Sequence, residues 1–147
     1  MAITICQFAV PGRPVPKARP RITKRGTYTP SSTVEYEKRV RLSWMESGAP
    51  KIPENTPIRV CVFAWIPLPM SMSRKKRIAL DGTPHTGHRA DIDNIVKSVC
   101  DALNGYAYPD DCAIWRIEGK KLCHNGEGFT DVILVAGEDP AAEEGPA

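Results

Sequence analysis

The stretch DIDNIVKSVCDALNG, residues 91–105, is the strongest structural signal in the chain. Apolar residues recur along it at the spacing of one helix face, and they are Ile92, Val96, Val99 and Leu103. Gly105 follows in the position where helices commonly end. The pattern predicts an amphipathic helix over residues 92–103, with two carboxylates, Asp91 and Asp93, at its start.

Strand patterns surround this helix on both sides. Runs of β-branched and aromatic residues predict strands over residues 3–10, 58–66, 113–122 and 129–135. The second of these runs is apolar nearly throughout, so we expect it to lie in the centre of a sheet.

Two further helices are expected. One covers residues 34–46 and ends at Gly48, and a short basic one covers residues 72–80. The candidate caps of the first helix are Ser31, Ser32 and Thr33. The resulting order of strand, helix, strand, helix, helix, strand and strand predicts an α+β fold. We expect one compact domain over residues 1–136, with a mixed β-sheet and helices packed mainly on one face.

The composition is that of a soluble globular protein. The chain has 147 residues, of which 41% are hydrophobic and 25% are charged. No apolar run approaches the roughly 18 residues of a membrane span, so we expect a cytoplasmic protein with no membrane partner. The cysteines show no C-x-x-C spacing, which predicts reduced thiols. Residues 137–147 are acidic and rich in Ala, Gly and Pro, which predicts a disordered tail.

Basic residues are distributed unevenly, although the formal net charge is only +3. One cluster follows the first strand and consists of Lys17, Arg19, Arg21, Lys24 and Arg25. A second cluster lies in the short basic helix and consists of Arg74, Lys75, Lys76 and Arg77. Such clusters suit a polyanion such as DNA, or else they are a solvated surface.

The two carboxylates at the start of the central helix have a structural explanation and a functional one. Asp91 can cap the first-turn amides, and Asp93 gains from the helix dipole. Capping does not explain a second doublet, Asp110 and Asp111, which opens the next strand. If that strand lies beside the helix start, the carboxylates converge and need a cation. A hard divalent ion such as Mg²⁺ selects oxygen ligands of this kind.

Lys97 lies one helical turn beyond Asp93 and projects from the same side. Its ammonium can stabilise charge on a scissile phosphate, or it can form an ordinary ion pair with Asp93 or Asp101. The residues alone therefore predict a Mg²⁺-dependent phosphodiesterase acting on nucleic acid. An EF-hand calcium loop is excluded, because it needs Gly and Glu where this chain has Val96 and Ala102.

With these motifs the sequence resembles the RusA family of Holliday junction resolvases. The family signature, Asp-x-Asp-Asn-x-x-Lys-x-x-x-Asp-Ala-Leu followed by Asp-Asp and an apolar strand, matches residues 91–114. The segments KARPRITKRGTYTP and SMSRKKR resemble members carried by bacteriophages and prophages, and they extend the resemblance over residues 11–135. Ala90 departs from the pattern, since a proline often precedes the first aspartate.

The resemblance implies a homodimeric endonuclease that cuts four-way DNA junctions by paired, symmetric nicks. It implies Mg²⁺ as the cofactor, with Mn²⁺ able to replace it, and a role in DNA recombination or repair in a bacterial cell. The metal ligands carried over by position are Asp91, Asp93, Asp110 and Asp111. Lys97 becomes the catalytic lysine, and Asn94 and Asp101 take supporting roles, Asp101 by orienting that lysine.

Two other functions stay open. The first is a catalytically silent protein that binds four-way junctions or other branched DNA, with or without Mg²⁺. The second is a Mg²⁺ enzyme acting on nucleotides, for which the basic clusters would be superfluous.

Overall fold

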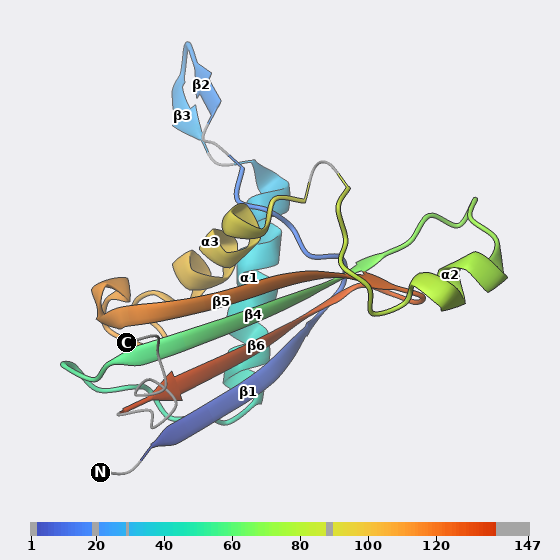
Figure 1. Cartoon of the computed structure of the whole chain (residues 1–147). Helices are drawn as coiled ribbons and strands as arrows, with labels where there is room; N and C mark the ends of the chain where they lie inside the picture. The colour runs from blue at the N-terminus through green and yellow to red at the C-terminus, as the bar shows by residue number, and fades with distance from the viewer. Residues whose placement is uncertain (1–2, 19–20, 29, 88–89, 138–147) are drawn as a thin grey trace, which may run out of the picture.

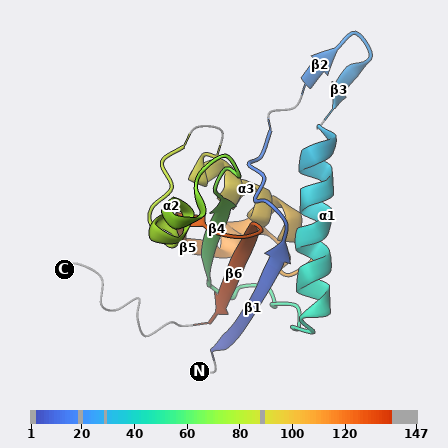
Figure 2. The ribbon, with the colours of Figure 1, turned by 90° about the vertical axis from the view of Figure 1, so that its right-hand side faces the viewer.

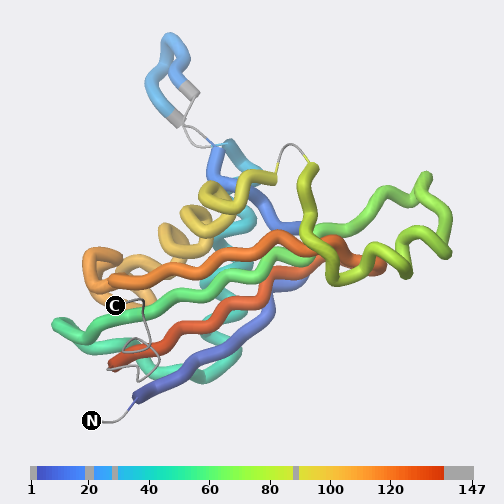
Figure 3. Tube along the Cα trace, viewed as in Figure 1, coloured from blue at the N-terminus to red at the C-terminus, as the bar shows by residue number. Residues whose placement is uncertain are grey.

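A four-stranded mixed sheet forms the centre of the fold (Figure 1). The computed structural model describes residues 3–18, 21–28, 30–87 and 90–137. The strands stand side by side (Figure 3) in the order β1 (Thr4–Pro11), β6 (Phe129–Ala136), β4 (Ile58–Pro67) and β5 (Ile114–His124). β6 is antiparallel to both of its neighbours, whereas β4 and β5 are parallel. The mixed sheet and the central position of the apolar strand β4 are confirmed.

Two helices, α1 (Ser31–Glu46) and α3 (Ile92–Leu103), pack on one face of this sheet (Figure 2). Alternate residues of β4 point towards them and are buried, among them Ile58 and Val60. α3 buries seven of its residues against the sheet and α1, as its predicted apolar stripe requires. The short helix α2 (Arg74–Leu80) lies beyond the end of the strands (Figure 1). The predicted arrangement of helices mainly on one face is therefore confirmed.

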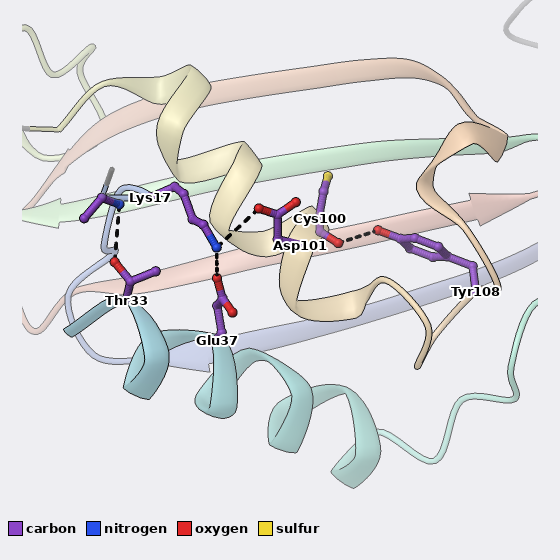
Figure 4. Close-up of polar contacts among 7 residues, drawn as sticks. Lys17, Thr33, Glu37, Cys100, Asp101 and Tyr108 are labelled. Atoms are coloured by element: carbon purple, nitrogen blue, oxygen red, sulfur yellow. Dashed lines mark hydrogen bonds and ion pairs between the residues drawn. The ribbon is translucent and has the colours of Figure 1, made fainter. Parts of the chain in front are cut away.

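The predicted cap of α1 is wrong. The helix begins at Ser31 with Pro30 in the cap position, and no side chain caps it. The carbonyl of Pro30 accepts hydrogen bonds from the amides of Thr33 and Val34 at 3.1 and 3.3 Å. The buried hydroxyl of Thr33 accepts the amide of Ala18 at 3.3 Å, so it ties the incoming chain to the helix (Figure 4).

A small hairpin that the sequence did not predict stands apart from the sheet (Figure 1). Its strands are β2 (Arg21–Thr23) and β3 (Gly26–Tyr28), paired antiparallel. Gly26 has a φ of +122°, which favours glycine, and its carbonyl accepts a hydrogen bond from the Thr23 hydroxyl at 3.0 Å. Strands of three residues contain too few positions for an alternating pattern to be recognised.

Three expectations about the chain as a whole can be compared with the structure. No helix in the described ranges is long and apolar enough to cross a membrane. The cysteines are unpaired, and Cys112 is exposed while the others are buried, which agrees with reduced thiols. The predicted tail lies almost entirely outside the described residues, which end at Gly137.

Lys17 joins the two helices that cover the sheet (Figure 4). Its ammonium contacts Glu37 of α1 at 2.5 Å and Asp101 of α3 at 3.4 Å, and its amide donates to the carbonyl of Asn94 at 2.8 Å. Partial burial opposes the charge, but Glu37 and Asp101 outweigh it and raise the pKa of Lys17. The pairing therefore stabilises the fold at neutral pH and is lost as the pH rises through that raised pKa.

The Lys17→Met substitution should lower the free energy of unfolding by about 1–3 kcal/mol, because two half-buried carboxylates lose their shared cation. Urea unfolding measures this change. Lys38→Met on the exposed side of α1 is the matched control and should change stability by less than about 0.5 kcal/mol. If Lys17→Met instead leaves stability unchanged and weakens DNA binding, then Lys17 contacts DNA as the sequence analysis predicted.

Candidate functional site

The start of α3 presents two carboxylates to solvent. Asp91 occupies the cap position, and its backbone carbonyl accepts the amide of Ile95 at 3.1 Å. Its side chain makes no capping hydrogen bond, so the predicted capping role of this carboxylate is wrong. Asp93 follows in the first turn and is also exposed. Both carboxylates are therefore available to a ligand at this end of the helix.

Gly119 on the edge strand β5 allows α3 to lie close to the sheet at this end. A Cβ atom at Gly119 would come within 2.9 Å of Ile92 Cγ1 and 3.1 Å of Val96 Cγ2. A larger residue would therefore push the first turn of α3 away from β5. The position of the carboxylates at residues 91 and 93 depends on this close contact.

Lys97 is exposed on the same helix, one turn beyond Asp93. The ordinary ion pair that was its alternative explanation is not formed, because no salt bridge joins Lys97 to Asp93 or Asp101 in the described part of the chain. Asp101 contacts Lys17 instead. The ammonium of Lys97 is thus free to contact a ligand, whereas its expected orientation by Asp101 is not observed.

The second carboxylate doublet lies at the opposite end of α3. Asp110 caps a short 3-10 helix, η1 (Asp111–Ala113), by accepting the amide of Cys112 at 3.2 Å. The amide of Asp111 donates a hydrogen bond to Oδ1 of Asn104, the C-cap residue of α3, at 3.2 Å. α3 has 12 residues, and a helix of that length spans about 18 Å.

The condition for convergence of the four carboxylates is therefore not met within one chain. Gly119, in the middle of β5, lies beside the start of α3, whereas Asp111 precedes the strand at the other end. Among the described residues, no three His, Cys, Asp or Glu side chains gather where they could hold a metal ion. The donor chemistry fits a hard cation, because the candidate ligands are carboxylates. One chain alone does not assemble them.

Asp110 and Asp111 perturb one another. Hydrogen bonding to Asp110, partial desolvation and the negative charges of Asp110 and Asp101 raise the pKa of Asp111. The amide of Cys112 and hydrogen bonding to Asp111 lower the pKa of Asp110. At neutral pH the doublet therefore holds two repelling charges that a proton or a cation would relieve.

The basic residues expected to bind DNA have different environments. Lys24 and Arg25 are exposed at the tip of the β2–β3 hairpin. On α2, Arg74, Lys75 and Lys76 are exposed, whereas Arg77 is half-buried. In two perpendicular views the start of α3 lies between the hairpin and α2 (Figure 1; Figure 2). The remaining members of the predicted set are Lys17, which is paired internally, Arg21, of which only the backbone is described, and Arg19, which lies outside the described residues.

Sequence reasoning missed two basic residues close to the loop that leads to α3. Lys121 on β5 donates its ammonium to the carbonyl of Gly87 at 3.4 Å and so holds that loop. Burial, followed by the charges of Lys121 and Arg13, lowers the pKa of His85 in the same loop. Neither Arg13 nor Lys121 belongs to the two basic clusters named in the sequence analysis. The pairing of β5 with this loop could have identified Lys121, but it gives no signal for Arg13.

Comparison with known proteins places this domain among the endodeoxyribonucleases. The family model described as Endodeoxyribonuclease RusA matches residues 11–130. A protein described as "Uncharacterized protein YqaN", from Bacillus subtilis (strain 168), is 31% identical over 135 residues, which cover 87% of this chain and 94% of that protein. The chain belongs to the RusA family. Family membership implies a nuclease that resolves Holliday junctions and therefore binds branched DNA.

The Asp111→Asn substitution should raise the melting temperature at pH 7. The folded pKa of Asp111 is higher than its ordinary value, so its ionisation at neutral pH lowers the stability of the folded state. The gain should disappear as the pH falls through that raised pKa, because the wild-type carboxyl is then protonated. Thermal unfolding followed by circular dichroism over a pH series tests this, and a loss of stability at pH 7 would contradict it.

Proposed function

We propose that this chain is a Mg²⁺-dependent, structure-selective DNA endonuclease that acts as a homodimer and resolves four-way junctions by paired, symmetric nicks. The observation that carries the proposal is the start of α3 in a chain of the RusA family. There, two exposed carboxylates and a lysine that forms no salt bridge among the described residues share one end of a helix. The Asp91 carboxylate forms no capping hydrogen bond, and Asp93 gains only the weak stabilisation of the helix dipole.

Asp91 and Asp93 would hold the metal ion from one side, because both residues are exposed and the Asp91 side chain makes no capping hydrogen bond. Asp111, with Asp110 beside it, would supply further oxygens. A bound Mg²⁺ activates water and offsets the negative charge that develops on a phosphodiester. The mutual repulsion of Asp110 and Asp111 supports this assignment, since cation binding relieves it.

Lys97 would contact the scissile phosphate. It projects from α3 one turn beyond Asp93 and has no competing carboxylate partner among the described residues. An ammonium at this point donates to phosphate oxygens and stabilises the charge that grows on the leaving oxygen. The exposed cations of the β2–β3 hairpin and of α2 would hold the neighbouring DNA backbone.

A second copy of the chain would complete the carboxylate set. The two doublets lie at opposite ends of α3, too far apart for one chain to place them around one ion. Twofold symmetry that sets two α3 helices antiparallel would bring the Asp93 end of one chain to the Asp111 end of the other. The edge strand β5 supports an interface here, because its Trp115 and Ile117 are 49% and 56% exposed.

Incubation with a labelled four-way junction should give two symmetric nicks with Mg²⁺, fewer or none without it, and no comparable cleavage of linear duplex. Asp93→Asn should reduce cleavage by at least about a hundredfold, because it removes a metal-binding charge. It should bind the junction as tightly as the wild type or more tightly, since it also removes repulsion of the phosphate. Gel-shift and cleavage assays on the same preparation measure both effects.

Equal cleavage of junction and duplex would contradict the resolvase function. A second candidate, a junction-binding protein without catalysis, is favoured by the lack of a complete carboxylate cluster in the described part of one chain. It predicts tight junction binding that does not respond to Mg²⁺, and no nicks.

Mixing two inactive variants tests the shared site directly. If each site combines the Asp93 end of one chain with the Asp111 end of the other, then Asp93→Asn mixed with Asp111→Asn should regain cleavage. The mixed dimer contains one site with both residues intact, so up to about half of the molecules should nick one strand. Each variant alone stays inactive. A mixture that stays inactive although the subunits exchange would show that each site lies within one chain.

A further inference from the structure

A hollow of about 630 Å³ lies at the base of α2, and two arginines line it. Arg77 enters it from α2, and Arg13 enters it from the segment that follows β1. The turn between β5 and β6 closes one side and includes Glu127 and Gly128. None of the carboxylates at residues 91, 93, 110 and 111 lines this hollow, so it is distinct from the candidate metal site.

Arg77 differs from the three exposed cations of the same helix. Its Nε atom is buried and has no hydrogen-bond acceptor among the described residues. Its Nη1 donates to the sulfur of Met70 at 3.2 Å, and a thioether is a weak acceptor. Among the residues that the structure describes, no oxygen accepts a hydrogen bond from this guanidinium, although it lines the hollow. A side chain in that position gains by turning to an anion.

The backbone of Arg13, which lines the same hollow, packs closely against the turn between β5 and β6. A Cβ atom at Gly128 would lie 3.0 Å from the Cα of Arg13 and 2.8 Å from Pro67 Cδ, so only glycine allows the turn to approach. Glu127 is the one carboxylate among the residues that line the hollow, and it forms no ion pair with either arginine in the described part of the chain. Two positive charges therefore face one negative charge.

We propose that this hollow binds a backbone phosphate of a DNA arm that adjoins the junction. A guanidinium donates two parallel hydrogen bonds to a phosphate, which the sulfur of Met70 cannot accept. The apolar walls at Pro67 and Leu68 suit the deoxyribose on either side of that phosphate. The inference rests on the proposed nuclease function and adds to it a fixed contact outside the cleavage site.

Junction binding by Arg77→Gln and Arg13→Gln, measured over a salt series, tests this site. Each variant should weaken binding about tenfold and reduce the slope of log affinity against log salt concentration by about one, as expected for the loss of one phosphate contact. Arg77→Lys should keep the slope but not the affinity, because an ammonium lacks the paired donors. Lys51→Gln, exposed at the far end of β4, is the control and should bind as the wild type does.

The experiment distinguishes a failure of the phosphate site from a failure of the proposed nuclease function. If the wild type cleaves junctions while Arg77→Gln, Arg13→Gln and Lys51→Gln all bind equally well, the phosphate site is wrong and the nuclease function stands. If the wild type neither binds nor cuts junctions, both fail. Should Arg77→Gln be unfolded by circular dichroism, Arg13→Gln decides alone, because its exposed side chain has no ion pair among the described residues.

Discussion

The length and burial of α3 constrain the rest of the site. The helix buries seven of its 12 residues, so it cannot slide or rotate without opening the core. Its length keeps the carboxylates at its two ends about 18 Å apart. An aspartate side chain reaches only a small part of that distance. The four carboxylates therefore act as two separate pairs within one chain, and any single ion that uses both pairs requires a second chain.

The apolar periodicity of the sequence predicted where α3 and the main strands lie along the chain. It did not predict which parts of them lie next to one another in the fold. The bounds of α3 and the central place of β4 follow from apolar patterns that depend only on nearby residues. Which end of β5 meets the start of α3 depends on the course of the chain between them. β5 runs back along α3, so Gly119 meets Ile92, and Asp111 is left at the far end. The expected convergence failed for this reason, although α3 and β5 were both predicted close to their observed bounds.

The basic clusters show the same limit of sequence-based prediction, because residues that are close in the sequence can point to different parts of the fold. Neighbouring cations point in different directions, so Lys17 pairs with Glu37 inside the fold, whereas Lys24 is exposed on the hairpin. Arg13 was missed because it lies outside both basic clusters, and the structure brings it to the same hollow as Arg77. Net charge along a segment predicts a polyanion partner, but the direction of each side chain decides which residue can meet it.

Stability explains the place of Asp110, whose carboxylate caps η1, but it does not explain the places of Asp91 and Asp111. An aspartate in a cap position normally stabilises its helix by about 0.5–2 kcal/mol through its side chain, and Asp91 forgoes that hydrogen bond. Asp110 and Asp111 are adjacent, and the hydrogen bond and charge of Asp110 hold the pKa of Asp111 above its ordinary value. A sequence shaped for stability alone would use the cap and separate the doublet. Departures of this kind concentrate at functional sites, and in this chain they fall at both ends of α3, which lies within the range matched by the RusA family.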